Sequence, residues 1–189
     1  MRKVKSLKEF IVEQSITLPT IYCDLDETLV DFFHGADSTL NKFGYPEWRD
    51  PFWKEMTNEE ADNIRWSIIN KQPQFWKNLR WLRDGHKLWE FIQPYNPHIL
   101  SHATEFMETS YPEKIQWIQE NLGINNIERQ NVVMKRGDKS LFAQTNGKPN
   151  VLIDDYEKNC RDFRAAGGIA IQHVSATKTI SELKKLGFK

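Results

Sequence analysis

Five short apolar runs without acidic or basic residues restrict the fold of this chain more than any other feature. They are Thr20–Cys23, His98–Leu100, Val132–Met134, Val151–Ile153 and Ile169–Ile171. Runs so brief and so uniformly apolar are typical of central strands in a parallel sheet that is covered on both faces. We therefore expect five buried strands in one sheet.

Helical patterns follow three of these runs. Ser110 and Glu113 form a capping-box pattern at the start of one helix, and Gly123 marks its expected end. Residues 157–166 and 178–186 predict two more helices. Alternating strands and helices indicate right-handed βαβ units, so the predicted fold is α/β with a doubly wound parallel sheet.

One segment interrupts this alternation, because residues 31–96 are far longer than an ordinary crossover between strands. Within it, Thr57 and Glu60 form a second capping-box pattern, and Pro73 stops the helix that follows. Asp84 precedes a further helical pattern that we expect to return to the sheet.

The long segment divides the chain into two predicted parts. Residues 1–30 and 85–189 would form the core, and residues 31–84 would form a small helical cap inserted after the first strand. Most of the tryptophans lie in or near this segment, where their rings can pack helices together.

The bulk composition excludes several classes of partner. The net charge is +0, which gives no overall attraction to a nucleic acid polymer or a membrane. The chain has 2 cysteines and no apolar run as long as a signal peptide or a membrane span requires. We expect a cytoplasmic protein whose site for a charged ligand is local.

Acidic pairs follow two of the predicted strands. Asp24 and Asp26 come after the first strand, and Asp154 and Asp155 end the fourth. Ligands of open α/β sheets bind beyond the carboxyl ends of the strands, where these acids would meet. Two carboxylates about 4 Å apart repel each other by roughly 4 kcal/mol at an effective dielectric constant near 20. A bound cation relieves that repulsion, and oxygen ligands without nearby histidine or cysteine favour Mg²⁺.

The other two strand ends carry groups that can bind phosphate. Ser101 and His102 end the second strand, and Lys139 follows the third. Each has an ordinary alternative: Lys139 alone could be a solvated surface lysine, and Asp154 and Asp155 could cap a helix. The combination of acids, hydroxyl, lysine and acids, each after a different strand, indicates phosphoryl transfer.

These residues, in this order, resemble the four motifs of the haloacid dehalogenase (HAD) superfamily. The motifs here are Asp24–Thr28, Ser101, Lys139 and Asp154–Asp155. The resemblance implies a Rossmann-like core and a Mg²⁺-dependent phosphatase. It further implies that Asp24 attacks phosphorus and becomes an aspartyl-phosphate, while Asp26 protonates the leaving oxygen and later activates water.

The same resemblance assigns the remaining ligands. Ser101 and Lys139 would hold the phosphate oxygens, and His102, next to Ser101, would border them. The metal ligands would be Asp24, the backbone carbonyl of Asp26, and Asp154, with Asp155 supporting the ion.

A closer resemblance is to the 5'(3')-deoxyribonucleotidases. It rests on Asp31-Phe32 after the first motif, on the segments 75–79 and 111–117 with Gly123 after the latter, and on the segments 136–139 and 152–155. It implies that the partner is a small phosphate ester, a (deoxy)nucleoside monophosphate. By the same resemblance, Phe32, Phe75 and Trp76 would contact the base, although packing between helices is the ordinary role of such rings.

Two residues and one loop depart from the pattern of that family and bear on the substrate more than on the reaction; the loop, residues 140–150, is longer than usual between the third and fourth motifs. Glu27 occupies a position where the family usually carries glycine, and Ser101 occupies one where threonine is usual.

Three alternatives stay open at this point. The first is a phosphatase for a sugar phosphate or a phosphopeptide, since Asp24–Val30 also resembles phosphatases that act on the tail of RNA polymerase; the long insertion favours a small substrate. The second is a receiver-like signalling domain, although its phosphorylated aspartate lies on the third strand. The third is an inactive binding module, against which the full set of acids and lysine argues.

Overall fold

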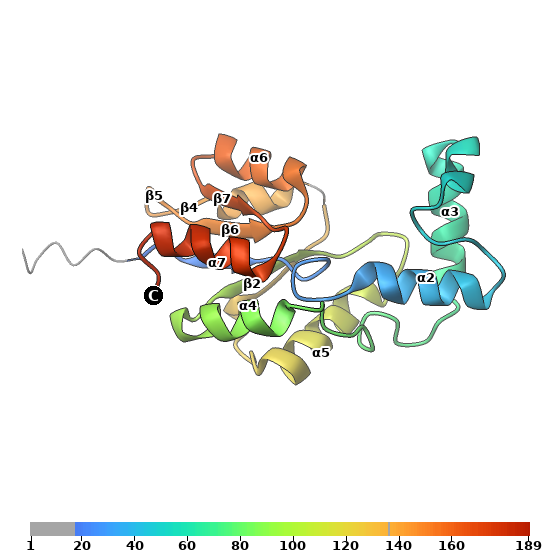
Figure 1. The fold of residues 1–189 in the computed structure, drawn as a ribbon, viewed down its shortest axis with the longest axis horizontal. Helices are drawn as coiled ribbons and strands as arrows, with labels where there is room; N and C mark the ends of the chain where they lie inside the picture. The colour runs from blue at the N-terminus through green and yellow to red at the C-terminus, as the bar shows by residue number, and fades with distance from the viewer. Residues whose placement is uncertain (1–17, 136) are drawn as a thin grey trace, which may run out of the picture.

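A five-stranded parallel sheet forms the centre of the structure, a computed structural model that describes residues 18–135 and 137–189 (Figure 1). Residues 1–17 of the predicted core and Arg136 lie outside the described residues. The strand order is β3-β2-β1-β6-β7, and every neighbouring pair is parallel. The strands are β1 (Ile21–Cys23), β2 (His98–His102), β3 (Gln130–Val133), β6 (Val151–Asp154) and β7 (Ile169–Gln172). The five predicted strands and the doubly wound α/β fold are therefore confirmed.

The strand order reverses at β1, and this reversal brings the acids that follow β1 next to those that end β6. After β1 the chain continues to β2 on one side, whereas β6 pairs with β1 on the other. Cys23 is in register with Ile153, and the Asp24 N–H donates to the Ile153 carbonyl at 2.9 Å. Asp24 and Asp154 therefore lie side by side at the switch point of the sheet, where ligands of this fold class bind.

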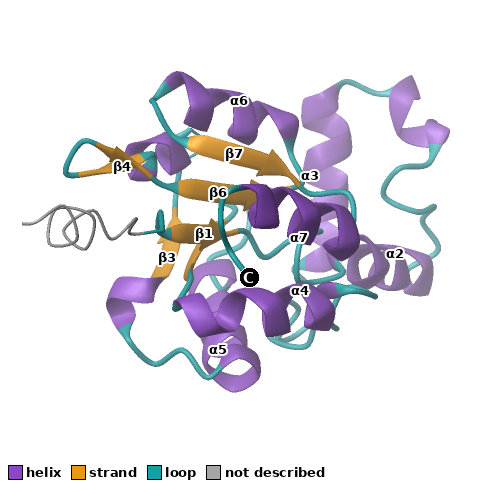
Figure 2. Ribbon diagram, turned by 60° about the vertical axis from the view of Figure 1, so that its left-hand side comes forward, coloured by secondary structure: helices purple, strands orange, loops and turns teal. Residues whose placement is uncertain are grey.

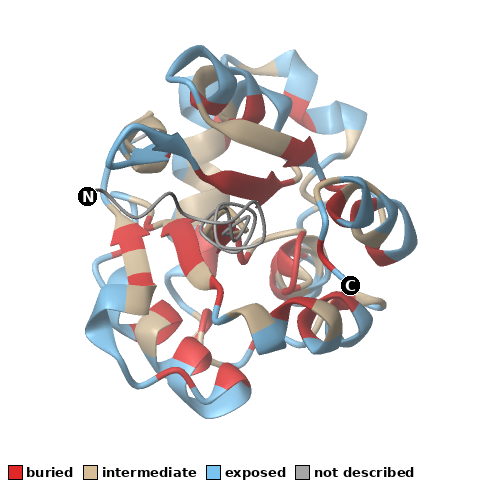
Figure 3. Cartoon of the chain, turned by 90° about the vertical axis from the view of Figure 1, so that its left-hand side faces the viewer, coloured by how far each residue is buried: buried red, intermediate tan, exposed pale blue. Residues whose placement is uncertain are grey.

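Alternating side chains of the central strands fill two separate cores. Ile21 and Cys23 belong to a large cluster with residues of α4 (Gly85–Ile92), α5 (Ser110–Leu122) and α7 (Ala176–Lys185). Tyr22 faces the other side, in a smaller cluster with Phe163 of α6 (Glu157–Ala165). Figures 2 and 3 show the strands enclosed between these helices and largely buried. Burying one such apolar side chain contributes about 1.5–3 kcal/mol, which explains why uniformly apolar strands occupy this position.

Two of the three helix-end signals predicted from the sequence are found in the structure. The capping box predicted at Thr57 is confirmed: its hydroxyl accepts from the Glu60 N–H, and the Glu60 carboxylate accepts from the Thr57 N–H. Gly123 ends α5 in the left-handed conformation, with a φ of 66°. The capping box predicted at Ser110 and Glu113 is wrong, because both side chains serve tertiary contacts. Ser110 donates to the Thr104 carbonyl at 3.1 Å, and Glu113 accepts from the Trp76 N–H at 2.9 Å.

A group of helices lies beyond the carboxyl edge of the sheet, at one end of the molecule (Figure 1). It comprises α2 (Phe32–Lys42), the 3-10 helix η1 (Pro51–Glu55) and α3 (Asn58–Ile69). These helices have a small core of their own, made of Leu40, Trp53, Ala61 and Ile68. The arrangement agrees with a helical insertion after β1, and the exact cap boundary at residues 31–84 stays a prediction.

The two chain segments that enter and leave this group run side by side. Val30 and Trp81 form an antiparallel bridge, and the Asp31 carboxylate pairs with the Arg80 guanidinium at 2.7 Å. Gly85 follows at the start of α4, where an added Cβ would lie 2.6 Å from the Leu29 carbonyl oxygen. Only glycine fits this approach, and α4 then packs against α7, as expected for a helix that returns to the sheet.

The remaining elements are short. The 3-10 helices η2 (Gln93–Tyr95), η3 (Ile127–Arg129) and η4 (Asp138–Phe142) connect the main elements. Strands β4 (Gln144–Thr145) and β5 (Lys148–Pro149) form a small antiparallel hairpin. No helix among the described residues is long and apolar enough to cross a bilayer.

Candidate active site

A cavity of about 450 Å³ lies between the carboxyl edge of the sheet and the helices of the insertion. Its size falls within the usual range for small-molecule sites. The sheet side is acidic and carries a lysine, whereas the insertion side is mainly aromatic. The lining residues used below are Asp24, Asp26, Glu27, Phe32, Phe33, Trp48, Trp66, Trp76, His102, Lys139 and Asp155.

Three carboxylates meet at the sheet end of this cavity. One oxygen from each of Asp24, Asp154 and Asp155 lies within 4.8 Å of the others. Asp24 and Asp154 are buried, with 5% and 0% of their surface exposed. Burial, with the neighbouring charge of Asp24 next, raises the pKa of Asp155 to about 8. These acids are far apart in the sequence, and the structure brings them together as the sequence predicted. The raised pKa of Asp155 shows that the negative charges of the group repel one another.

Lys139 bridges two of the three acids. Its Nζ lies 2.9 Å from Asp24 Oδ1 and 2.6 Å from Asp154 Oδ2. Burial acts to lower the pKa of Lys139, but the two carboxylates outweigh it and the net shift is upward. The lysine therefore stays charged at the point where a phosphate would approach Asp24.

The three acids also fit a divalent cation. All their donor atoms are carboxylate oxygens, which Mg²⁺ prefers. Asp154 is held in place from behind, because its carboxylate accepts from the Tyr156 N–H at 2.9 Å and from the Asn159 side chain. A supported carboxylate of this kind is the usual form of a metal ligand.

The Asp26 carboxylate lines the same cavity and pairs with Lys114. Lys114 Nζ lies 2.5 Å from Asp26 Oδ2, 3.1 Å from Ser101 Oγ and 2.7 Å from the His102 carbonyl oxygen. An ammonium group has three N–H donors, so all of them are used. Burial raises the pKa of Asp26, and the charge of Lys114 opposes that shift.

Lys114 was missed as a site residue by the sequence reasoning, which noted it only within a helix motif. A signal was present, because Lys114 lies three and four positions before Trp117 and Ile118, on the buried face of α5. A lysine on an apolar face needs a partner.

The predicted phosphate-binding residues occupy different depths. His102 and Lys139 line the cavity. Ser101 lies behind its wall with 0% exposure, and its hydroxyl accepts from Lys114. Because that hydroxyl is already an acceptor, its own proton is left to point elsewhere.

The loop after β1 turns sharply and is tied to α2. The N–H groups of Thr28, Leu29 and Val30 all donate to the Leu25 carbonyl. Glu27 lies in the left-handed region with a φ of 54°, which is strained for a residue with a side chain. Its carboxylate accepts from the Phe33 N–H at 2.9 Å and so satisfies a free donor in the first turn of α2.

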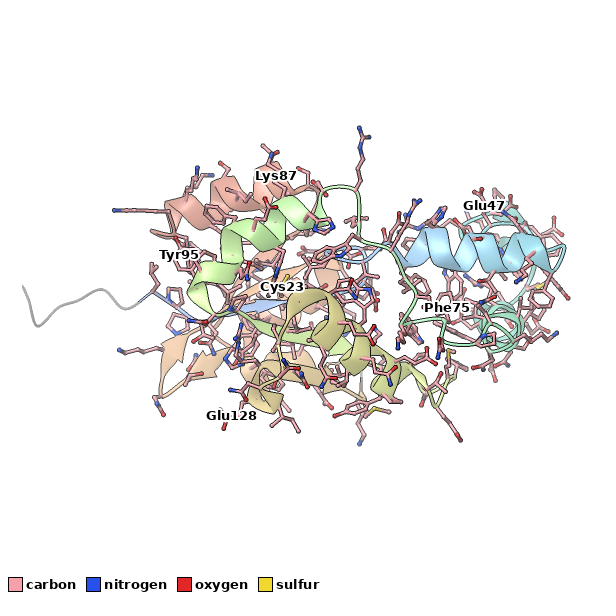
Figure 4. The ribbon with its side chains drawn as sticks, turned by 90° about the horizontal axis from the view of Figure 1, so that it is seen from below. Cys23, Glu47, Phe75, Lys87, Tyr95 and Glu128 are labelled. Atoms are coloured by element: carbon pink, nitrogen blue, oxygen red, sulfur yellow. The ribbon has the colours of Figure 1, made fainter. Side chains whose placement is uncertain are left out.

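Two of the three aromatic residues predicted to bind the base line the cavity, and the third does not. Phe32 and Trp76 lie on the cavity wall and stack on each other, with ring centroids 5.3 Å apart. Phe75 does not line this cavity; it lies among the side chains of the insertion, far from Cys23 of β1 (Figure 4). Three rings that the sequence did not assign to the site also line the cavity: Phe33, Trp48 and Trp66.

Trp76 is held tightly from several sides. Only 4% of its surface is exposed, its backbone N–H donates to Glu113, and Lys114 Nζ lies 4.2 Å from its ring centroid. The last contact is a cation–π interaction. Trp76 therefore covers the lysine that pairs with Asp26.

Comparison with known proteins agrees with these features. The family model described as "5' nucleotidase, deoxy (Pyrimidine), cytosolic type C protein" matches residues 18–184. No curated protein matches the chain.

Solved structures resemble the chain in fold, each at low sequence identity. A hydrolase from Streptococcus pneumoniae TIGR4 has a TM-score of 0.52 and 15% identity, with 88% of this chain and 98% of that chain covered. YfnB from Bacillus subtilis, described as a HAD-hydrolase bound to magnesium, has a TM-score of 0.51 and 12% identity, with 81% and 87% covered. L-2-haloacid dehalogenase from Xanthobacter autotrophicus has a TM-score of 0.50 and 15% identity, with 89% and 83% covered.

Proposed function

Because the chain belongs to the 5' nucleotidase, deoxy (pyrimidine), cytosolic type C family, whose members are phosphatases of HAD type, we propose that it is a Mg²⁺-dependent phosphatase of (deoxy)nucleoside monophosphates. One observation carries the proposal. Asp24, Lys139, Asp154 and Asp155 gather at one end of a cavity whose other end is aromatic. This arrangement complements a molecule with a phosphate at one end and a flat base at the other.

Asp24 is the proposed nucleophile. Its Oδ1 accepts from the Leu25 N–H at 2.8 Å and from Lys139 at 2.9 Å, which leaves Oδ2 as the oxygen to attack phosphorus. The P–O bond to the nucleoside breaks as the bond to Asp24 forms, and an aspartyl-phosphate results. Water then attacks that intermediate and releases phosphate. Splitting one displacement into two steps is the general advantage of covalent catalysis.

Asp26 is the proposed acid and base. It would give a proton to the departing oxygen of the nucleoside and later take one from the attacking water. A raised pKa favours a carboxyl group that must hold a proton before transfer, and burial raises the pKa of Asp26. Lys114 keeps this carboxyl in one position.

The charge on the phosphate would be balanced by Lys139 and by a metal. The carboxylates of Asp24, Asp154 and Asp155 and the backbone carbonyl of Asp26 would hold Mg²⁺. When bound, the ion supplies positive charge that offsets repulsion between the phosphate and the acids. Ser101 would hold a phosphate oxygen through the hydroxyl proton that its contact with Lys114 leaves unused, and because Ser101 is fully buried, that oxygen would have to reach the floor of the cavity. His102 lines the cavity.

The aromatic wall is the proposed site of the base. Trp48 and Trp66 are half-buried there and leave surface for a flat ligand, beside Phe32. Stacking of a base on an aromatic ring contributes about 1–3 kcal/mol. The helical insertion would act as a cap over the substrate, with residues 31–84 as its proposed extent. The family description supports the predicted cytoplasmic location.

A phosphate-release panel tests the proposal. The purified protein with Mg²⁺ should hydrolyse deoxynucleoside and nucleoside monophosphates faster than sugar phosphates, phosphoserine or a phosphopeptide. Turnover should stop in excess chelator and return when Mg²⁺ is restored. Asp24→Asn should lose turnover while its thermal unfolding remains cooperative. Hydrolysis of sugar phosphates alone, or full activity of Asp24→Asn, would refute the proposal.

A further inference from the structure

A second cavity lies at the amino end of the sheet, where β2 and β3 begin. Its volume is about 400 Å³, which is large enough for a small molecule. Figure 4 shows Tyr95 and Glu128, which are next in the chain to two of its lining residues, at the end of the molecule away from Glu47 of the insertion. The lining residues used below are Trp89, Gln93, Asn96, Leu122, Ile124 and Arg129.

The guanidinium group of Arg129 is only partly used by the protein. Its Nε and Nη2 both donate to the Pro97 carbonyl oxygen, at 3.0 Å and 2.9 Å. A guanidinium group has five N–H donors, so three remain, including both on Nη1. Among the described residues, no carboxylate forms an ion pair with Arg129.

The charge of Arg129 is also partly removed from water. The residue is half-buried, and this burial lowers the pKa of its guanidinium group. No described residue that lines the second cavity is acidic. The cavity therefore contains a half-buried positive charge without a counter-ion, and a bound anion would supply one.

The other lining residues favour a compact oxyanion. Gln93 and Asn96 contribute side-chain amides from η2 and its end, a different element from the one that carries Arg129. Trp89, Leu122 and Ile124 each expose at most 6% of their surface, so they offer little contact to an apolar or aromatic group. Donors from two elements suit phosphate, whose oxygens point in four directions, better than a planar carboxylate.

We propose that the second cavity binds inorganic phosphate, with Arg129 as its counter-ion and the amides of Gln93 and Asn96 as further donors. The site is separate from the proposed active site, because Asp24 lies at the carboxyl edge of the sheet and Arg129 directly precedes β3 at the amino edge. The inference therefore does not depend on the proposed nucleotidase function.

Calorimetric titration of inorganic phosphate in excess chelator is the test. Without a divalent ion, the acids around Asp24 repel phosphate, so the second cavity is measured alone. We expect one saturable site that binds phosphate at least about tenfold more tightly than acetate. Arg129→Met should weaken phosphate binding by at least about tenfold.

Two further variants separate binding from folding. Arg129→Met also removes the contact with Pro97, whereas Gln93→Asp leaves that contact intact and places a negative charge at the exposed edge of the cavity. Gln93→Asp should therefore weaken phosphate binding by a similar factor. Arg161→Met is the matched control, since the Arg161 side chain is 66% exposed and lines no described cavity, and it should bind phosphate as the wild type does.

Thermal unfolding in chelator gives an independent measurement. Phosphate should raise the Tm of the wild type and of Arg161→Met, and should leave the Tm of Arg129→Met and Gln93→Asp nearly unchanged. Wild-type affinity in Gln93→Asp would overturn the proposal, as would the absence of saturable binding. Loss of binding in Lys139→Met but not in Arg129→Met would assign the phosphate to the active site instead. None of these results bears on whether the protein hydrolyses nucleotides.

Discussion

The ammonium group of Lys114 lies 2.5 Å from the carboxylate of Asp26, although 88 positions separate them in the sequence. The same ammonium group reaches Ser101 and the His102 carbonyl at the end of β2. Helix α5 therefore connects the candidate acid and base to the candidate phosphate site. The contact also explains why a lysine with 2% exposure is tolerated inside the core.

Lys114→Met should lower kcat by about tenfold to a hundredfold with a small change in KM. Methionine fills similar space, but it leaves Asp26 without its partner and Ser101 without its donor. An interaction that orients catalytic groups is expected to affect kcat more than binding. The measurement is steady-state kinetics with an aryl phosphate, alongside thermal unfolding.

Lys77→Met is the control for this substitution. Lys77 pairs with Glu120 at 2.9 Å near the surface of the molecule, and such pairs contribute little. Its kinetic constants should match those of the wild type. A Lys114→Met protein that folds and keeps full kcat would show that Lys114 only packs.

The metal-free protein should lose stability as the pH rises from 5 to 9. The pKa of Asp155 is about 8 in the folded protein, above the value near 3.9 of an unfolded aspartate. A raised pKa in an acid means that its stabilising effect is present at low pH and is lost as the pH passes through the folded value. Thermal unfolding followed between these pH values measures the slope.

Two comparisons make this pH prediction specific. Asp155→Asn should flatten the decline, because the amide cannot ionise. Asp162→Asn should leave the decline unchanged, because Asp162 is partly exposed and its pairing with Lys158 lowers its pKa, so it stays ionised over this pH range. Mg²⁺ should also reduce the decline, since the ion binds the charged carboxylate. An equal slope for the wild type and Asp155→Asn would mean that Asp155 does not titrate in this range.

The sheet and its acidic edge could be predicted because their causes are local. Short apolar runs mark the buried strands, and parallel strands bring their carboxyl ends to one edge whatever lies between them. Asp24 and Asp154 therefore met as expected, without any knowledge of the insertion.

Features that depend on packing between distant segments were harder to predict from the sequence. The Ser110–Glu113 pattern failed as a cap because Glu113 binds the backbone of Trp76, which belongs to another segment. The partner of Lys114 could not be deduced for the same reason. Which aromatic rings reach the cavity depends on how the insertion folds over the sheet, so Trp66 was overlooked.

Thr57→Ala should lower the free energy of unfolding by about 1 kcal/mol, because its hydroxyl caps the first turn of α3. For a protein of this size, that corresponds to about 2–4 °C in Tm. Thr57→Ser keeps the hydroxyl and should remain close to the wild type in the same unfolding experiment. Equal losses in both variants would point to the methyl group instead of the cap.

Trp66 and Trp76 should affect catalysis in different ways. Trp66 is half-buried on the cavity wall, so Trp66→Ala removes a surface for stacking and should raise KM for nucleotides by about tenfold, with less effect on a small aryl phosphate.

Trp76 is almost fully buried and lies over Lys114. Trp76→Ala should therefore lower kcat for both substrates by a similar factor, because it exposes the Lys114–Asp26 pair to water. The sequence assigned Trp76 to the base, and a nucleotide-specific rise in KM for Trp76→Ala would favour that assignment over the one argued from its burial. Trp76→Phe retains a ring above the ammonium group and should recover most of the lost kcat, a rescue that a simple loss of packing elsewhere would not produce.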